Sequence, residues 1–136
     1  MSRYLASTAL IAMIFIVAAC ATTDSSKGKA SYTKATISKA KELFDRGALF
    51  IDVSDDLEYE NGHIKGAINL DWNKTFSEEE LSKIAGKNQE IVIYCYEQCY
   101  LSRQASAKAV SWGYTKVYQF YDGYPKWKSA GYPTAN

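Results

Sequence analysis

The stretch EIVIYCYEQCYL, residues 90–101, gives the strongest indication of the fold. Its first half is an almost continuous apolar run with β-branched residues, which is typical of a strand buried on both faces of a parallel sheet. Its second half is polar and aromatic and leads into a segment with helical spacing. The stretch therefore predicts a buried strand with Cys95 as its last residue, then a loop and a helix.

Downstream of this stretch, the sequence predicts one more helix, one more strand and a final helical turn. The helix is expected from about Ser102 to Trp112, with Ala105 and Ala109 on one face. The run KVYQF, residues 116–120, is expected to be the last strand, and GYPKWKSAG a last helical turn.

Upstream, helices and strands alternate in the same way. ISKAKELFDRG predicts a helix with Ser38 as N-cap and Gly47 as its stop, and a strand follows at Ala48 to Val53. LEYENGHIKGAINL reads as a helical turn, a glycine bend and a short strand. SEEELSKIAG predicts a helix with Ser77 as N-cap and Glu80 in the capping-box position.

Length, composition and alternation together indicate one doubly wound α/β domain. A chain of 136 residues is ordinary for a single domain. Strand and helix alternate, so ligands are expected at the carboxyl ends of the central strands. With 16 basic against 15 acidic residues, the chain lacks the positive charge of a nucleic-acid-binding protein. Three cysteines are too few for a disulfide framework.

The first residues differ in character from the rest. After Arg3, residues 4–19 are almost wholly apolar, which is short for a spanning helix and fits a secretory signal, although a permanent membrane helix stays open. The end of the run, Val-Ala-Ala-Cys at 17–20, resembles a bacterial lipoprotein signal. That resemblance implies cleavage after residue 19 and lipidation of Cys20, with the protein facing the periplasm, and Ala21 suggests the outer membrane.

These segments suggest a division of the chain into three parts. Residues 1–19 are expected to be the signal peptide, and residues 20–31 the lipidated cysteine and a flexible tether, since the tether contains no large apolar residue. Residues 32–136 are expected to form the folded domain.

Cys95 is the expected nucleophile, because it lies where the central strand gives way to a loop and a helix N-terminus. Backbone N–H groups and the helix end favour thiolate and can hold an anionic adduct. The alternative is that Cys95 is simply a small buried core residue. The candidate anion-binding loop comprises Tyr96, Glu97, Gln98, Cys99, Tyr100, Leu101 and Ser102.

Four segments between about residues 31 and 133 resemble a rhodanese-like, or sulfurtransferase, domain. These are LFIDVSDDLEYENGHIKGAINL, IVIYC, SRQASAKAVSWGYTKVYQF and YDGYPKWKSAGYP. The resemblance implies a five-stranded parallel sheet flanked by helices. It also implies that Cys95 takes sulfur from a small anionic donor such as thiosulfate and passes it to a thiol or to cyanide, with no metal or organic cofactor.

The loop departs from that family's pattern in its charges. Leu101 stands where the family usually has arginine, and Glu97 places a like charge near an anionic donor. Cys99 has three interpretations: a residue that never meets Cys95, a resolving thiol, or a disulfide partner of Cys95 in an oxidising periplasm. His63, the one histidine, and Asp52 are expected to make structural hydrogen bonds.

Several tyrosines are expected near the strand ends, either packing or forming a rim that recognises a partner: Tyr94, Tyr96, Tyr100, Tyr121 and Tyr124. Three functions follow from the sequence. The first is a lipid-anchored sulfurtransferase that uses Cys95. The second is a thiol-disulfide redox protein that uses Cys95 and Cys99. The third is a non-catalytic binding module on the same scaffold.

Overall fold

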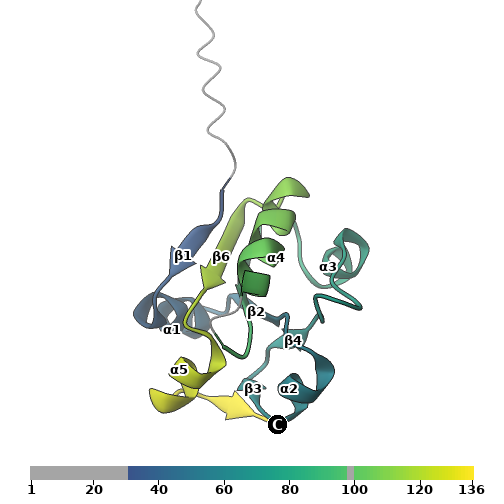
Figure 1. Cartoon of the computed structure of the whole chain (residues 1–136). Helices are drawn as coiled ribbons and strands as arrows, with labels where there is room; N and C mark the ends of the chain where they lie inside the picture. Colours follow the sequence, from purple (N-terminus) through teal and green to yellow (C-terminus); the bar gives the residue numbers. More distant parts are fainter. Residues whose placement is uncertain (1–30, 98–99) are drawn as a thin grey trace, which may run out of the picture.

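A five-stranded, fully parallel sheet forms the centre of the molecule (Figure 1). The computed structural model describes residues 31–97 and 100–136. The strand order is β1-β6-β5-β2-β4, so β5 is the central strand. The strands span Thr33–Ala35 (β1), Leu49–Asp52 (β2), Ile68–Asn69 (β4), Glu90–Tyr94 (β5) and Lys116–Phe120 (β6).

Five helices in the described part surround this sheet, and a small antiparallel pair lies beside it. The helices span Ile37–Asp45 (α1), Asp56–Glu60 (α2), Glu78–Ile84 (α3), Tyr100–Ser111 (α4) and Gly123–Ser129 (α5). The antiparallel pair joins β3 (His63–Ile64) to β7 (Thr134–Ala135). The predicted α/β fold with five parallel strands flanked by helices is therefore confirmed.

Two buried clusters occupy the two faces of the sheet. Helices α3 and α4 cover one face, where Leu81 and Ala105 meet the strands. Helices α1 and α5 cover the other, where Leu43 and Trp127 do so. Covering both faces explains why EIVIYC reads as a continuous apolar run, because side chains on either side of the strand are buried.

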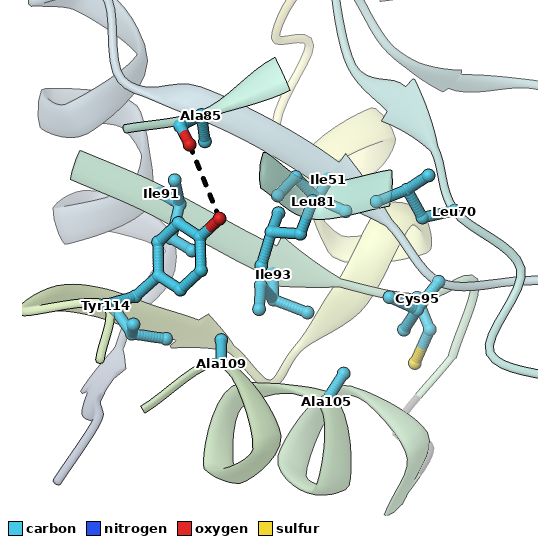
Figure 2. Packing of buried hydrophobic residues seen from close by; sticks show 12 residues of the cluster. Ile51, Leu70, Leu81, Ala85, Ile91, Ile93, Cys95, Ala105, Ala109 and Tyr114 are labelled. Atoms are coloured by element: carbon cyan, nitrogen blue, oxygen red, sulfur yellow. Dashed lines mark hydrogen bonds between the residues drawn. The ribbon is translucent and has the colours of Figure 1, made fainter. Parts of the chain in front are cut away.

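Successive residues of β5 and the loop contribute to opposite clusters. Ile91, Ile93 and Cys95 belong to the cluster with α4, whereas Val92 and Tyr94 belong to the cluster with α5. Figure 2 shows Cys95 beyond Ile93 in the first cluster, with Ala105 and Ala109 on the helix opposite. The period-2 alternation of a strand thus directs Cys95 toward α4.

The helix starts were predicted with mixed success. Ser77 caps α3, accepting a hydrogen bond from the backbone N–H of Glu80 at 3.2 Å, as predicted. The prediction for α1 was wrong, because Thr36 rather than Ser38 is the N-cap and accepts from the N–H of Lys39. Both hydroxyl residues suit the position, and the helix begins at the first one, so Ser38 lies inside it.

The strand ends also differ from the prediction in small ways. Cys95 lies just after β5 rather than at its end, and α4 begins at Tyr100 rather than Ser102. Strands β1, β3 and β7 were missed, so KVYQF is not the last strand and the predicted glycine bend contains a short strand. All three are too short to show an apolar alternation: β1 has 3 residues, and β3 and β7 have 2 each.

The predicted signal peptide, Cys20 and almost all of the predicted tether lie outside the described residues. Across residues 31–97 and 100–136, no helix is both long enough and apolar enough to cross a membrane.

Candidate functional site

Cys95 lies at the carboxyl end of the central strand, in the loop that leads to α4. The residue is only 2% exposed. In Figure 1 the start of α4 lies at the same end of the molecule as α5 and α2. This is the position at which ligands bind in open parallel sheets, because strand ends and helix starts meet there.

The sulfur of Cys95 has two notable features. It is disulfide-bonded, and its partner lies outside the described residues. Its Sγ also lies 2.9 Å from the backbone carbonyl oxygen of Glu97. A carbonyl oxygen is partially negative, so this contact favours a neutral sulfur over a thiolate. The described arrangement therefore fits the oxidised site, and an anionic sulfur requires the Glu97 carbonyl to turn away.

The backbone of the loop is held from β2 on one side. The N–H of Tyr96 donates to Ser54 Oγ at 2.7 Å. Ser54 is 1% exposed and follows the end of β2. Of the loop N–H groups expected to surround the sulfur, that of Tyr96 is thus engaged by Ser54, while Gln98 and Cys99 lie outside the described residues.

From the other side the loop is held by the start of α5. The N–H of Tyr124 donates to the Cys95 carbonyl at 3.0 Å. Gly123, at φ +73°, approaches so closely that a Cβ there would lie 2.8 Å from the same carbonyl oxygen and 3.2 Å from that of Tyr96. Only glycine combines this backbone conformation with this close approach.

A buried carboxyl group supports Ser54. Asp52 is 1% exposed, and its Oδ1 accepts from the N–H of Ser54 at 2.9 Å. The hydroxyls of Ser54 and Tyr94 also hydrogen-bond to this carboxyl group, and Tyr94 accepts from the N–H of Ile64. Burial is the main cause that raises the pKa of Asp52 above its usual range, against these hydrogen bonds. Asp52 thus has the structural role expected of it.

A pocket of about 430 Å³ opens beside Cys95. Its described lining consists of Ser54, Glu58, Cys95, Tyr96, Glu97 and Leu101. The two charged side chains in this lining, Glu58 and Glu97, are both carboxylates. No lysine or arginine is among these residues. Burial raises the pKa of Glu58, and the negative charges of Asp55, Asp52 and Glu97 raise it further. The pocket is thus acidic, as the presence of Glu97 in the loop suggested.

The remaining predicted residues divide between core and surface. Ser102 is 1% exposed and its hydroxyl accepts from the side-chain amide of Gln119, so it faces the interior. Tyr100 is exposed on the surface. His63 stacks on Tyr59 and its Nδ1 lies 2.8 Å from the Tyr59 carbonyl oxygen, in line with a structural role.

The tyrosines are also split between interior and surface. Tyr94 is fully buried and Tyr124 nearly so, whereas Tyr121 is 40% exposed. Tyr96 and Tyr124 contact each other with ring centroids 5.8 Å apart. Only part of the predicted aromatic rim is therefore available to a partner.

Sequence reasoning missed three residues of the site: Ser54 as a loop support, Glu58 and Gly123. Ser54 could have been found from strand pairing. Asp52 pairs with Tyr94, so two residues further along Ser54 stands beside Tyr96. Glu58 and Gly123 gave no comparable signal, because their proximity to Cys95 depends on how α2 and α5 pack.

Similarities to known proteins agree with this geometry. A family model described as a rhodanese-like domain matches residues 36–130. Thiosulfate sulfurtransferase GlpE of Haemophilus influenzae (strain PittEE) is 29% identical over 103 residues, covering 76% of this chain and 94% of that protein. The protein of the same name from Coxiella burnetii (strain RSA 331 / Henzerling II) is 34% identical over 92 residues, covering 67% and 80%.

A solved structure supports the same conclusion about the fold. The crystal structure of the Alr3790 protein from Anabaena sp. aligns with a TM-score of 0.66 at 25% identity, covering 75% of this chain and 91% of that one.

Proposed function

This chain belongs to the rhodanese-like domain family, and on that premise we propose that it is a sulfurtransferase that carries sulfur on Cys95. The observation that supports this role is the position of Cys95. It follows the central parallel strand, precedes α4 and lines a pocket. The named thiosulfate sulfurtransferases among its relatives support the same reaction class.

The proposed reaction begins with the reduced enzyme, so a thiol reductant must first open the disulfide of Cys95. The thiolate then attacks the outer sulfur of a donor such as thiosulfate; the sulfur–sulfur bond of the donor breaks and sulfite leaves with its electron pair. Cys95 now carries a persulfide. A thiol or cyanide attacks the outer sulfur of the persulfide and regenerates the Cys95 thiolate.

Intact-mass analysis of the reduced full-length chain, before and after thiosulfate, tests this proposal. The expected result is a gain of one sulfur atom that disappears on addition of cyanide. Cys95→Ser should abolish the gain, whereas Cys99→Ser should reduce it only modestly. If the wild-type chain takes up no sulfur from thiosulfate or from an organic persulfide, the proposal is wrong, and if it also shows no thiol-disulfide exchange, a binding module becomes the better interpretation.

A second candidate function, thiol-disulfide exchange, is favoured by one observation: Cys95 is disulfide-bonded. In that reaction a substrate dithiol is oxidised as the protein disulfide is reduced, with the electrons and protons passing to the two protein sulfurs. Replacing Cys99 with serine distinguishes the two candidates. Loss of all activity with Cys99→Ser, together with no sulfur uptake by the wild-type chain, would favour exchange over sulfur transfer.

We further propose that the domain is anchored to a bacterial membrane through lipidated Cys20 and faces the periplasm, at the outer membrane. The support is in the sequence alone: the apolar residues 4–19, the Val-Ala-Ala-Cys end and the polar segment after it. More than one acyl chain is expected to give stable anchoring. Fractionation of cells that express the chain should find it with membranes, and Cys20→Ser should release the chain or leave it unprocessed. A wild-type chain recovered without lipid would contradict the proposal.

A further inference from the structure

The walls of the pocket beside Cys95 have an unusual charge for a site that receives sulfur from an anion. Glu58 comes from α2 and Glu97 from the loop, so the two carboxylates belong to different elements and face one pocket. Asp55 and the buried Asp52 add to the negative potential, because the charges of both raise the pKa of Glu58.

Another part of the lining favours negative charge at the sulfur of Cys95. Leu101 lies in the first turn of α4, a helix of 12 residues, so the pocket borders the start of that helix. The N-terminus of a helix carries partial positive charge that stabilises an anion. A substrate in this pocket therefore has both the helix start and the two carboxylates among its surroundings.

From this arrangement we propose that the pocket selects small aminothiols, thiols that carry a cationic group close to sulfur, as acceptors of the persulfide sulfur. The inference rests on the proposed sulfurtransferase function and names the class of its acceptor. The ammonium group lies against Glu58 and Glu97, while the thiolate reaches the sulfur of Cys95. An acceptor with a sulfonate or carboxylate in the same place meets like charges and is disfavoured.

The transfer is a simple displacement. The acceptor thiolate attacks the outer sulfur of the Cys95 persulfide, a new sulfur–sulfur bond forms on the acceptor, and the bond to Cys95 breaks. Cys95 leaves as thiolate with the electron pair, so no further oxidant or reductant is consumed.

Three acceptors of the same length test the selectivity: 2-aminoethanethiol, 2-mercaptoethanol and 2-mercaptoethanesulfonate. The full-length chain is reduced, loaded with sulfur at a high thiosulfate concentration and freed of donor, and the loss of sulfur from Cys95 is followed by mass spectrometry. The measured quantity is the rate ratio of the cationic to the anionic acceptor. It is compared among variants, so differences in intrinsic thiol reactivity cancel.

Neutralising the two carboxylates should lower this ratio. Both side chains are exposed, so water screens their interactions with the substrate, and a decrease of about threefold to tenfold is expected for Glu58→Gln with Glu97→Gln. Glu60→Gln is the matched control, because Glu60 lies on the same helix but is not among the lining residues. It should leave the ratio unchanged. An unchanged ratio in the double variant would overturn the inference.

A second measurement tests the charge of the pocket without sulfur transfer, by comparing how fast a cationic and an anionic reagent modify Cys95. Aminoethyl and sulfonatoethyl methanethiosulfonate each form a mixed disulfide with a thiolate and release methanesulfinate. In the reduced Cys99→Ser chain, modification of Cys95, identified by peptide mapping, should favour the cationic reagent, and the double glutamine variant should reduce this preference.

The two measurements separate the two claims. No persulfide on Cys95 from any donor refutes the proposed function and the aminothiol acceptor with it. If Cys95 forms a persulfide but the acceptor rate ratio, or the preference between the two reagents, is the same in the wild-type chain and in the double glutamine variant, the acceptor class alone is refuted.

Discussion

The two faces of the sheet differ in both chemistry and task. The cluster under α3 and α4 is largely aliphatic and contains Cys95, with small alanines on the helix opposite. The cluster under α1 and α5 is aromatic and is built around Trp127, which is fully buried. The first face therefore carries the sulfur of Cys95, and the second fixes the helix that supports the loop.

This division follows from side-chain size. Ala105 and Ala109 present little bulk, so α4 can approach β5 closely and its first turn can border the pocket. Trp127 instead contacts Phe44, Phe50, Phe120 and Tyr132, with ring centroids 5.0–6.2 Å apart. Large interlocking rings hold α5 in one position, and the start of α5 in turn contacts the backbone of Cys95. Aromatic packing on one face thus positions a sulfur on the other.

The largest expected effect comes from removing the central ring of the aromatic face. Trp127→Ala should reduce the free energy of unfolding by about 3–5 kcal/mol, because it leaves a large cavity and removes the hydrogen bond to the Pro133 carbonyl. Ile93→Val, on the aliphatic face, should cost about 0.5–1.5 kcal/mol. Denaturant unfolding measures both. Equal losses for the two variants would contradict the different roles of the two faces.

The next effect tests the contact between α5 and the loop. Gly123→Ala should cost at least about 2 kcal/mol, from positive-φ strain together with the collision at the Cys95 carbonyl. Gly131→Ala is a matched control with the same φ of +73° and no atom within 4 Å of the added Cβ. It should show only the strain, about 1–2 kcal/mol.

Activity separates these two glycine variants more clearly than stability. Gly123→Ala should displace the loop and slow sulfur transfer even below its unfolding transition, whereas the folded Gly131→Ala chain should retain wild-type rates. If the two variants transfer sulfur equally well, the approach of α5 does not position Cys95.

The same comparison explains which parts of the structure could be predicted from sequence. EIVIYC predicted the central strand and the position of Cys95 near its carboxyl end, because a strand buried on both faces requires a run of apolar residues that is visible in the sequence. The helix cap at Ser77 likewise needs only neighbouring residues. The very short strands β1 and β7 have no such sequence pattern, because their bounds depend on the strands with which they pair.

The candidate site was predictable only where it lies along the loop. The proposed nucleophile Cys95, the loop after it and its acidic residue Glu97 all come from residues 95–102. Glu58 and Gly123 reach the pocket or the loop through the packing of α2 and α5, and no local pattern encodes that packing. Ser54 lies between these cases, because strand register alone places it beside Tyr96.

A smaller effect is expected from the support on the β2 side. Ser54→Ala leaves the N–H of Tyr96 without its acceptor in a partly buried place, which should cost about 1–3 kcal/mol and slow sulfur transfer. Ser106→Ala is the control: it is also a buried serine, but its hydroxyl only donates to a carbonyl within α4. The control should be near wild type in both measurements. A Ser54→Ala chain with normal transfer rates would show that Ser54 does not position the loop.

The smallest effect is expected at Asp52, whose carboxyl group accepts a hydrogen bond from Ser54. The prediction concerns the direction in which the free energy of unfolding changes with pH. Because burial raises the pKa of folded Asp52 above the ordinary value of 3.8, the folded state binds its proton more tightly than the unfolded state. The stabilisation from that proton is complete below the unfolded pKa and is lost as pH rises through the folded pKa.

Asp52→Asn carries no titrating group there, so the stability of wild type relative to Asp52→Asn should fall as pH increases from about 3.8 upward. Urea unfolding of both chains across that range measures the difference. A difference that grows with pH instead would mean that the hydrogen bonds from Ser54 and Tyr94 outweigh burial and that Asp52 is held as a carboxylate.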